Sequence, residues 1–301
     1  MILVAGATGY LGGEICRRLV AAKRPVRGLV RRTSDGAAIE RLREWGVETV
    51  VGDLREPLSL ADACRDVDAV VSTVTSMRTR QDGDGIESTD QQGQLNLVDA
   101  AANAAVRRFV YVSYSGHVGE DDPLTVAKRS VERRLRESGM EYVILRPTYF
   151  MEAWLGPMLG FDYDAGQVTM YGSGERKISW ISLGDVAEFA VRVVDDPKAA
   201  NSVIELGGPE ALSPREVVRV FEEESGRTFR VQQVPEDAIA SQPAADSFQR
   251  AFSSLMRSYA RGDEIPMADT LKRYPVDMTP VRAYARQAVA SRQETPETTA
   301  R

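Results

Sequence analysis

Short apolar runs alternate with segments of helical periodicity throughout the first half of the chain. The apolar runs lie near residues 1–5, 26–31, 47–51, 68–74, 108–113 and 141–146. This alternation of strand and helix predicts an α/β fold with a doubly wound parallel sheet that is covered by helices on both faces. Ligands of such folds bind at the carboxyl ends of the strands, so we expect the functional site there.

The pattern is looser after Pro147. Short strands are predicted at 167–171, 177–181 and 202–206, and helices at 183–194 and 213–224. The segment 235–290 has helical spacing with several prolines, which is typical of a cap, an interface or both. Residues 291–301 are polar and predicted to be disordered.

These patterns predict three parts along the chain. Residues 1–150 form the sheet domain, and residues 151–290 form a smaller C-terminal α/β region, interleaved with the sheet, that binds the substrate. Residues 291–301 form a tail.

Three glycines connect the first strand to the first helix. A pyrophosphate approaches the N–H groups of a helix N-terminus closely only where no Cβ obstructs it. The spacing predicts a Rossmann-type dinucleotide site, in which Gly6 makes the turn, Gly9 approaches the phosphates and Gly12 packs the helix on the strand. The same turn adds the expected cofactor contacts Thr8, Tyr10 and Leu11. A glycine-rich turn without a ligand is the alternative.

Arg31 and Arg32 follow the second strand, where a dinucleotide presents its adenosine ribose. A guanidinium cannot accept a hydrogen bond from a 2′-OH, but it holds a 2′-phosphate through charge-assisted bonds. The pair therefore favours NADP(H) over NAD(H). Two solvated surface arginines are the alternative.

Two further strand ends offer cofactor contacts. Asp53, beside Leu54, follows the third strand and is expected to accept from the adenine amino group, unless it serves only as a turn or cap. Thr73 and Val74 end the fourth strand and are expected to line the ribose side of the cofactor.

Composition narrows the possible partners. The 301 residues carry a net charge of -6, so no overall basic field attracts nucleic acid or anionic lipid. The sequence shows neither a membrane-spanning apolar run nor a signal peptide, and we expect a cytoplasmic protein. Cys16 and Cys64 lie in separate predicted helices as reduced thiols, and with His117 as the single histidine no metal site is expected.

Several motifs together are similar to the NmrA-like branch of the atypical short-chain dehydrogenases/reductases, which includes isoflavone-reductase-like and NAD(P)H quinone-reductase-like proteins. They are residues 108–113, Lys128-x3-Glu132, residues 138–147 and residues 184–187, together with the N-terminal glycines and Arg31. The resemblance covers about the first 150 residues and reaches the 184–187 piece. It implies a further set of cofactor contacts: Ser113, Lys128, Pro147, Tyr149 and Phe150.

The wider superfamily uses a Tyr-x-x-x-Lys pair, and this chain has Leu124 at the tyrosine position before Lys128. Some NmrA-like relatives are thought to reduce substrates with the lysine alone, whereas others bind NADP without turnover as sensors. Lys128 fits either group, because it can anchor the cofactor and, at a lowered pKa, pass a proton. A surface lysine paired with Glu132 one helical turn on is the alternative.

His117 and Tyr114 lie after the fifth strand and are further candidate proton donors at the nicotinamide end. His117 is otherwise a solvated loop residue.

A set of large apolar side chains predicts a wide pocket for planar molecules: Met77, Met151, Trp154, Met158, Phe161 and Trp180. Core or dimer contacts are the alternative role for these residues. We therefore expect an NADP(H)-dependent reductase of a planar carbonyl, enone or quinone-like molecule, either a monomer or a homodimer. The rival interpretation is a non-catalytic NADP(H)-binding redox sensor or assembly protein.

Overall fold

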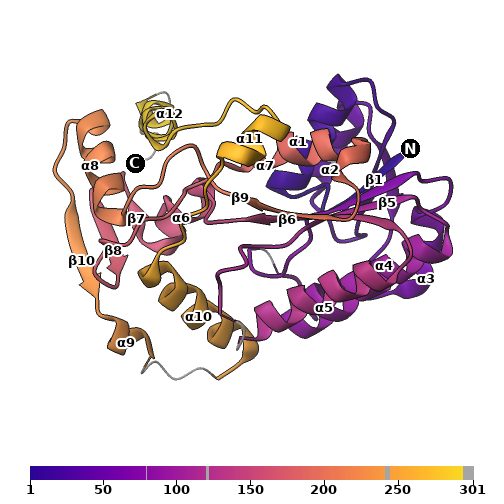
Figure 1. The fold of residues 1–301 in the computed structure, drawn as a ribbon, viewed down its shortest axis with the longest axis horizontal. Coiled ribbons are helices and arrows are strands. Elements are labelled where there is room, and N and C mark those ends of the chain that lie inside the picture. The colour runs from indigo at the N-terminus through magenta and orange to yellow at the C-terminus, as the bar shows by residue number, and fades with distance from the viewer. Residues whose placement is uncertain (79, 120–121, 241–244, 294–301) are drawn as a thin grey trace, which may run out of the picture. The chain divides into compact units, whose positions relative to one another are not determined.

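Seven strands form one sheet in the order β3-β2-β1-β4-β5-β6-β9 in the computed structural model (Figure 1). The structure describes residues 1–78, 80–119, 122–240 and 245–293. The strands are β1 (Ile2–Ala5), β2 (Val26–Val30), β3 (Glu48–Val51), β4 (Ala69–Ser72), β5 (Arg108–Val112), β6 (Glu141–Pro147) and β9 (Ser202–Leu206). The pairs β3–β2, β2–β1, β1–β4, β4–β5 and β5–β6 are parallel, which confirms the predicted Rossmann-type α/β sheet.

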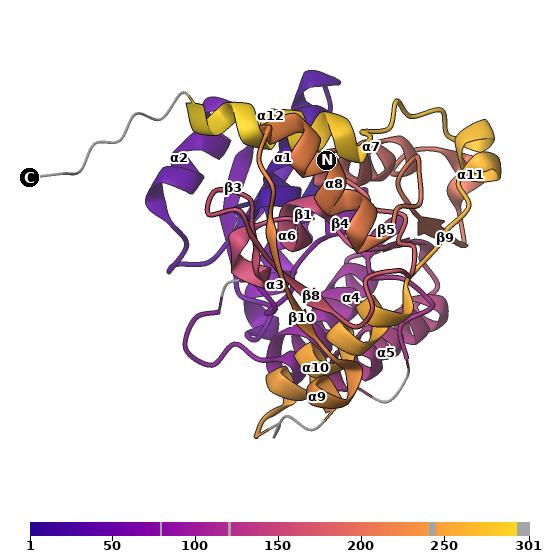
Figure 2. The ribbon, with the colours of Figure 1, turned by 90° about the vertical axis from the view of Figure 1, so that its left-hand side faces the viewer.

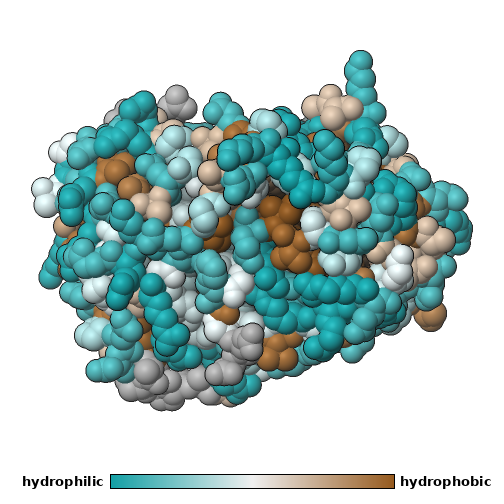
Figure 3. Space-filling view, in the orientation of Figure 1, coloured by the Kyte–Doolittle hydropathy of each residue, from teal (hydrophilic) through white to brown (hydrophobic). Residues whose placement is uncertain are grey.

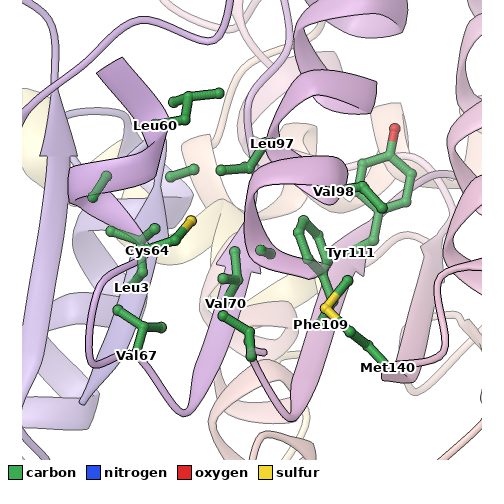
Figure 4. Packing of buried hydrophobic residues seen from close by; sticks show 14 of the residues in the cluster. Leu3, Leu60, Cys64, Val67, Val70, Leu97, Val98, Phe109, Tyr111 and Met140 are labelled. Carbon is green, nitrogen blue, oxygen red and sulfur yellow. The ribbon is translucent and has the colours of Figure 1, made fainter. Parts of the chain in front are cut away.

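Helices cover both faces of this sheet, as the doubly wound prediction requires. Helices α1 (Tyr10–Ala21), α2 (Gly36–Glu44) and α7 (Leu183–Val193) lie on one face, and α3 (Pro57–Ala63), α4 (Gln94–Asn103) and α5 (Pro123–Glu137) lie on the other (Figures 1 and 2). The apolar strand residues pack against these helices; Phe109 and Val70, for example, are fully buried beside Leu60 and Leu97 (Figure 4). The strand ends are thereby fixed on a rigid core.

The chain divides into two compact units. The first unit contains residues Met1–Pro147, Leu183–Glu205 and Ala244–Ser254, and the second contains Thr148–Ser182, Leu206–Pro243 and Leu255–Arg301. The sequence therefore crosses between the units several times, once within helix α10 (Ser247–Arg261).

A second sheet of three strands belongs to the second unit, in the order β10-β8-β7. Its strands are β7 (Phe161–Asp162), β8 (Gln167–Tyr171) and β10 (Arg230–Val234). Strand β8 pairs parallel with β10 and antiparallel with β7. The helices of this unit include α6 (Met151–Trp154), α8 (Pro214–Ser225), α11 (Ala268–Arg273) and α12 (Val281–Gln293).

Most predicted elements of the second half are present. The strands at 167–171 and 202–206 are confirmed as β8 and β9, and the two predicted helices are α7 and α8. The strand predicted at 177–181 is wrong, because Ile178 and Ile181 form only isolated bridges. The tail prediction is wrong at its start, since α12 continues to Gln293, and residues 294–301 lie outside the described part of the chain.

Cys16 and Cys64 are free and buried, as the sequence predicted, and burial raises the pKa of both thiols. Within the described residues, no helix has the length and hydropathy that a membrane span requires. The face of the molecule in Figure 3 is largely hydrophilic, with small groups of hydrophobic residues between.

Candidate functional site

The glycine turn after β1 has the geometry that its sequence predicts. Gly6 has a φ of +86°, a backbone conformation that L side chains rarely adopt, and Gly9 N–H donates to the Gly6 carbonyl at 2.9 Å. A Cβ on Gly12 would lie 2.1 Å from the Gly6 oxygen. Only glycine therefore lets α1 approach the end of β1 this closely.

Helix α1 starts immediately after this turn with its N-terminus uncapped. Gly9 is the N-cap residue, no side chain among the described residues accepts from the first N–H groups, and the first turn holds no acidic residue. A Cβ on Gly9 would meet only the Gly6 oxygen, at 3.2 Å, so the outer side of the turn is open. Thr8 and Leu11 are half-buried and Tyr10 is 73% exposed. Open backbone donors at a positive helix end fit a pyrophosphate.

Arg31 and Arg32 differ in their surroundings. The Arg31 Nη1 donates to both carboxylate oxygens of Asp84, at 2.9 and 2.7 Å, whereas Arg32 is exposed. The alternative of two solvated arginines is therefore wrong for Arg31. Asp84 was not predicted from the sequence, because it lies 53 residues away from Arg31.

Asp53 has a local partner. The guanidinium of Arg55 donates to both of its oxygens, and these bonds, aided by the Arg55 backbone N–H, lower the pKa of Asp53 despite partial burial. The adenine contact expected of Asp53 would have to share this carboxylate with Arg55. Leu54 is 6% exposed and belongs to the core of the sheet unit.

The residues that follow β4 form hydrogen bonds with β1 and α4. Thr73 lies against Gly6, and its hydroxyl donates to the Ala5 carbonyl at 3.2 Å. The Val74 carbonyl accepts from the side-chain amide of Gln94 at 2.9 Å. Both residues lie beside the glycine turn or β1. Their expected contact with the ribose stays a prediction.

Lys128 lies on the buried face of α5. This helix starts where Asp122 accepts hydrogen bonds from the N–H groups of Leu124 and Thr125, with Pro123 in the first turn. Lys128 falls on the helical stripe formed by Leu124, Ala127, Val131 and Leu135, and only 6% of it is exposed.

The Lys128 ammonium lies near two aromatic rings. Its Nζ lies 5.4 Å from the centroid of Tyr111 and 5.8 Å from that of Tyr114, and it makes no hydrogen bond or ion pair with the residues that the structure describes. Desolvation lowers the pKa of Lys128, although the nearby charges of Asp90 and Glu132 oppose the shift. The group is therefore poised to exchange a proton more readily than an exposed lysine.

Two further polar groups near Lys128 were missed by the sequence analysis. Asp90 is fully buried on η1 (Ile86–Gly93), a π-helix that packs against α5. Its Oδ2 accepts from the N–H and hydroxyl of Ser76, while its Oδ1 has no hydrogen-bond partner among the described residues.

The phenol of Tyr111 is equally buried and unpartnered within the described chain. Figure 4 shows it directed away from Phe109 and Met140. Burial raises the pKa of Tyr111, so the phenol holds its proton. Unsatisfied buried groups are rare in native proteins, and π-helical turns often occur at functional sites.

Glu132 does not pair with Lys128, so the surface-pair alternative is wrong. It accepts from Ser113 at 2.7 Å and forms ion pairs with Arg129 and Arg146. Ser113, expected at the cofactor, is therefore 4% exposed and bonded to this carboxylate.

Tyr114 and His117 follow β5 but differ in burial. The Tyr114 hydroxyl is hydrogen-bonded to Thr125, which in turn bonds to Asp122, and burial raises the pKa of the phenol. His117 is exposed in the loop, where its N–H donates to the Ser115 hydroxyl at 3.2 Å. Tyr114 thus lies beside Lys128 with its proton retained, and a role for either residue in proton transfer remains a prediction.

The segment after β6 is anchored by its backbone. The Pro147 carbonyl accepts from Ser115 N–H at 2.9 Å, and the Tyr149 carbonyl accepts from Ile181 N–H at 3.2 Å. Phe150 forms a parallel bridge with Ile181. Their contact with the cofactor stays a prediction.

Half of the predicted substrate residues lie in the core of the second unit. Met151 and Trp180 are 0% exposed and Phe161 is 5% exposed, and the Trp180 indole donates to the Leu212 carbonyl. The prediction that these three residues line a substrate pocket is corrected, because side chains packed in the core of their own unit are not free to contact a substrate. Met77 and Trp154 are half-buried and Met158 is 74% exposed, so these three remain candidates.

The fold and this site define a Rossmann-type α/β protein with a dinucleotide turn and a buried lysine. The NAD(P)H azoreductase of Xenophilus azovorans is 32% identical and covers 96% of this chain and 97% of its own. The photosystem II assembly factor Ycf39 of Synechocystis sp. is 30% identical, over 93% of this chain and 83% of its own. The crystal structure of Citrobacter sp. triphenylmethane reductase complexed with NADP(H) has a TM-score of 0.78 at 21% identity, covering 96% of this chain and 100% of its own.

The family model described as NmrA-like matches residues 1–284. The chain belongs to the NmrA-like family, as its motifs predicted.

Proposed function

We propose that this chain is a cytoplasmic NADP(H)-dependent reductase of a planar carbonyl, enone or quinone-like small molecule. Lys128 carries the proposal, because its side chain is largely buried, its ammonium has no hydrogen-bond partner in the described chain, and a lysine with a lowered pKa is typical of a functional site. The names of two similar proteins, an azoreductase and a triphenylmethane reductase, support reduction of unsaturated or aromatic compounds.

The residues of the first unit fit a phosphorylated dinucleotide. The open N-terminus of α1 would hold the pyrophosphate, and Arg31 would hold a 2′-phosphate. When bound, NADPH supplies a hydride. The chain itself supplies the backbone donors, the guanidinium and the proton.

Lys128 would provide that proton, directly or through a water molecule that it holds. Its lowered pKa brings proton release closer to neutral pH, which suits a general acid. Tyr111 and Tyr114 lie near the ammonium and keep their own protons, since burial raises the pKa of both phenols. Leu124, 3% exposed, has no proton to give.

Stopped-flow NADPH oxidation with quinones and aromatic enones tests this assignment. Wild type is expected to turn over, and Lys128→Ala to lose about 10²–10⁴-fold in rate, the usual contribution of general acid–base catalysis, with only a modest change in cofactor affinity. Lys272→Met is the control, because the Lys272 side chain is 78% exposed. Equal rates in wild type and Lys128→Ala would remove Lys128 from the chemistry.

A non-catalytic NADP(H)-binding sensor or assembly protein is the second candidate. The similarity to Ycf39, named as an assembly factor, favours it, as does the leucine at position 124. This candidate predicts that wild type binds NADPH but oxidises it with none of the acceptors. The stopped-flow experiment therefore separates the two functions.

A further inference from the structure

The loop 81–84 is bonded to the segment that follows β2. Asp84 accepts two hydrogen bonds from Arg31 Nη1 and one from Gln81 N–H at 2.9 Å, and its side chain is only 2% exposed. The Gln81 side chain exchanges hydrogen bonds with the Thr33 hydroxyl and carbonyl. Asp84 is therefore fixed beside Arg31 by its own loop.

The positive charges of Arg31 and Arg55 are balanced by the negative charges of nearby carboxylates. Arg55 lies 3.5 Å from Asp84 and forms a closer pair with Asp53, so two guanidinium groups face two carboxylates. The positive field that Arg31 alone would offer a phosphate is thereby reduced.

Arg31 nevertheless keeps part of its hydrogen-bonding capacity. Both bonds to Asp84 use Nη1, and the Nε and Nη2 groups have no partner among the residues that the structure describes. These two groups form one edge of the planar guanidinium, which matches a phosphate in a bidentate manner. A phosphate can therefore bind Arg31 while Asp84 stays in place.

We propose that Asp84 limits the preference of this chain for NADP(H), because its carboxylate opposes a 2′-phosphate at Arg31 and so lowers the affinity for NADP(H). The inference rests on the proposed function, in which Arg31 receives that phosphate. A carboxylate held against the same guanidinium repels the phosphate without blocking its access. NAD(H) lacks the 2′-phosphate and brings no charge to this position, so its affinity does not depend on Asp84.

Calorimetric titration of NADP+ and NAD+ into wild type and Asp84→Asn tests the proposal without any turnover. Asparagine keeps the shape and one acceptor oxygen but removes the charge. We expect Asp84→Asn to bind NADP+ about tenfold more tightly, because one repulsive charge is removed at short range. Its affinity for NAD+ stays within about twofold of wild type, since NAD+ has no 2′-phosphate to face Asp84.

Two further variants separate charge from fold. Asp84→Ser removes the same charge with a different side chain and is expected to show the same gain in NADP+ affinity. Asp82→Asn is the matched control, because Asp82 is exposed and only its backbone carbonyl contacts Arg55. This control is expected to change neither affinity by more than about twofold, since solvent and salt screen an exposed charge.

Weaker NADP+ binding in the Asp84 variants, with or without loss of NAD+ binding, would overturn the proposal, and so would an unchanged NADP+ affinity. Failure of the dinucleotide site itself looks different, because wild type would then bind neither dinucleotide. Failure of the reductase assignment alone leaves both affinities in place and shows only as absence of turnover in the stopped-flow experiment.

Discussion

Lys128 is buried where an ammonium group costs folding free energy. Replacing it with methionine keeps a long flexible side chain and removes the charge. We expect Lys128→Met to raise the free energy of unfolding by about 0.5–2 kcal/mol at pH 7, as substitutions at strained functional positions often do. Urea denaturation of both proteins measures this difference.

The increase in the free energy of unfolding expected for Lys128→Met also depends on pH. The native pKa of Lys128 lies below its ordinary value of 10.5, so the native state binds fewer protons than the unfolded chain between these two values. The destabilisation is therefore complete below the native pKa and disappears as pH rises toward 10.5. A Lys128→Met protein that is less stable than wild type at pH 7 would refute the cost assigned to the ammonium.

Single residues were predictable from the sequence where the reason was local. The glycine turn follows from the steric demand of one strand–helix junction, and Arg31 from its position after a strand. The roles of Asp84 and Asp90 were not predictable, because each interacts with a side chain more than 30 residues away in the sequence. Asp84 pairs with Arg31, and the charge of Asp90 acts on Lys128. The buried face of α5 did carry a signal for Lys128, since its neighbours at helical spacing are apolar.

Helix α5 is joined to the sheet by Glu132. This carboxylate is 1% exposed and pairs with Arg129 on its own helix and with Arg146 on β6. We expect Glu132→Gln to lower the free energy of unfolding by about 1–3 kcal/mol, because it removes a buried charged acceptor from the half-buried Arg129 and Arg146, although Arg146 keeps its pair with Glu205. Glu137→Gln, exposed on the same helix, should stay within about 0.5 kcal/mol of wild type in the same denaturation experiment.

Acid should remove the effect of Glu132. Desolvation raises the pKa of Glu132, but hydrogen bonds from Arg146 and Ser113 outweigh it and leave the pKa below its ordinary value of 4.5. The stabilisation is therefore fully present above pH 4.5 and is lost as pH falls through the native pKa. A difference between wild type and Glu132→Gln that persists below the native pKa would contradict this ion-pair network.

The elements of the sheet unit were predicted well because buried parallel strands are apolar throughout. Strand β4 ends at Ser72, earlier than predicted, and beyond it the carbonyl of Val74 accepts from the side chain of Gln94. The π-helix η1 was not predictable, because its sequence is polar and its extra residue per turn leaves no regular apolar spacing. It is nevertheless the element that carries Asp90.

At the scale of the whole molecule, the chain leaves the sheet unit after Pro147, returns for Leu183–Glu205 and returns again before Ser254. Sequence periodicity reports each element but not the unit in which it packs. For that reason aromatic residues such as Trp180 and Phe161 were assigned to a substrate pocket, although they form the core of the second unit.

Calorimetric titration of the purified wild-type chain with NADP+ and NAD+ tests the account most directly, since both candidate functions require a phosphorylated dinucleotide at the α1 turn and Arg31. We predict that NADP+ binds more tightly than NAD+, and that Arg31→Asp weakens NADP+ far more than NAD+ because it replaces a phosphate partner with a repelling charge. Absence of binding heat with both dinucleotides would contradict the account.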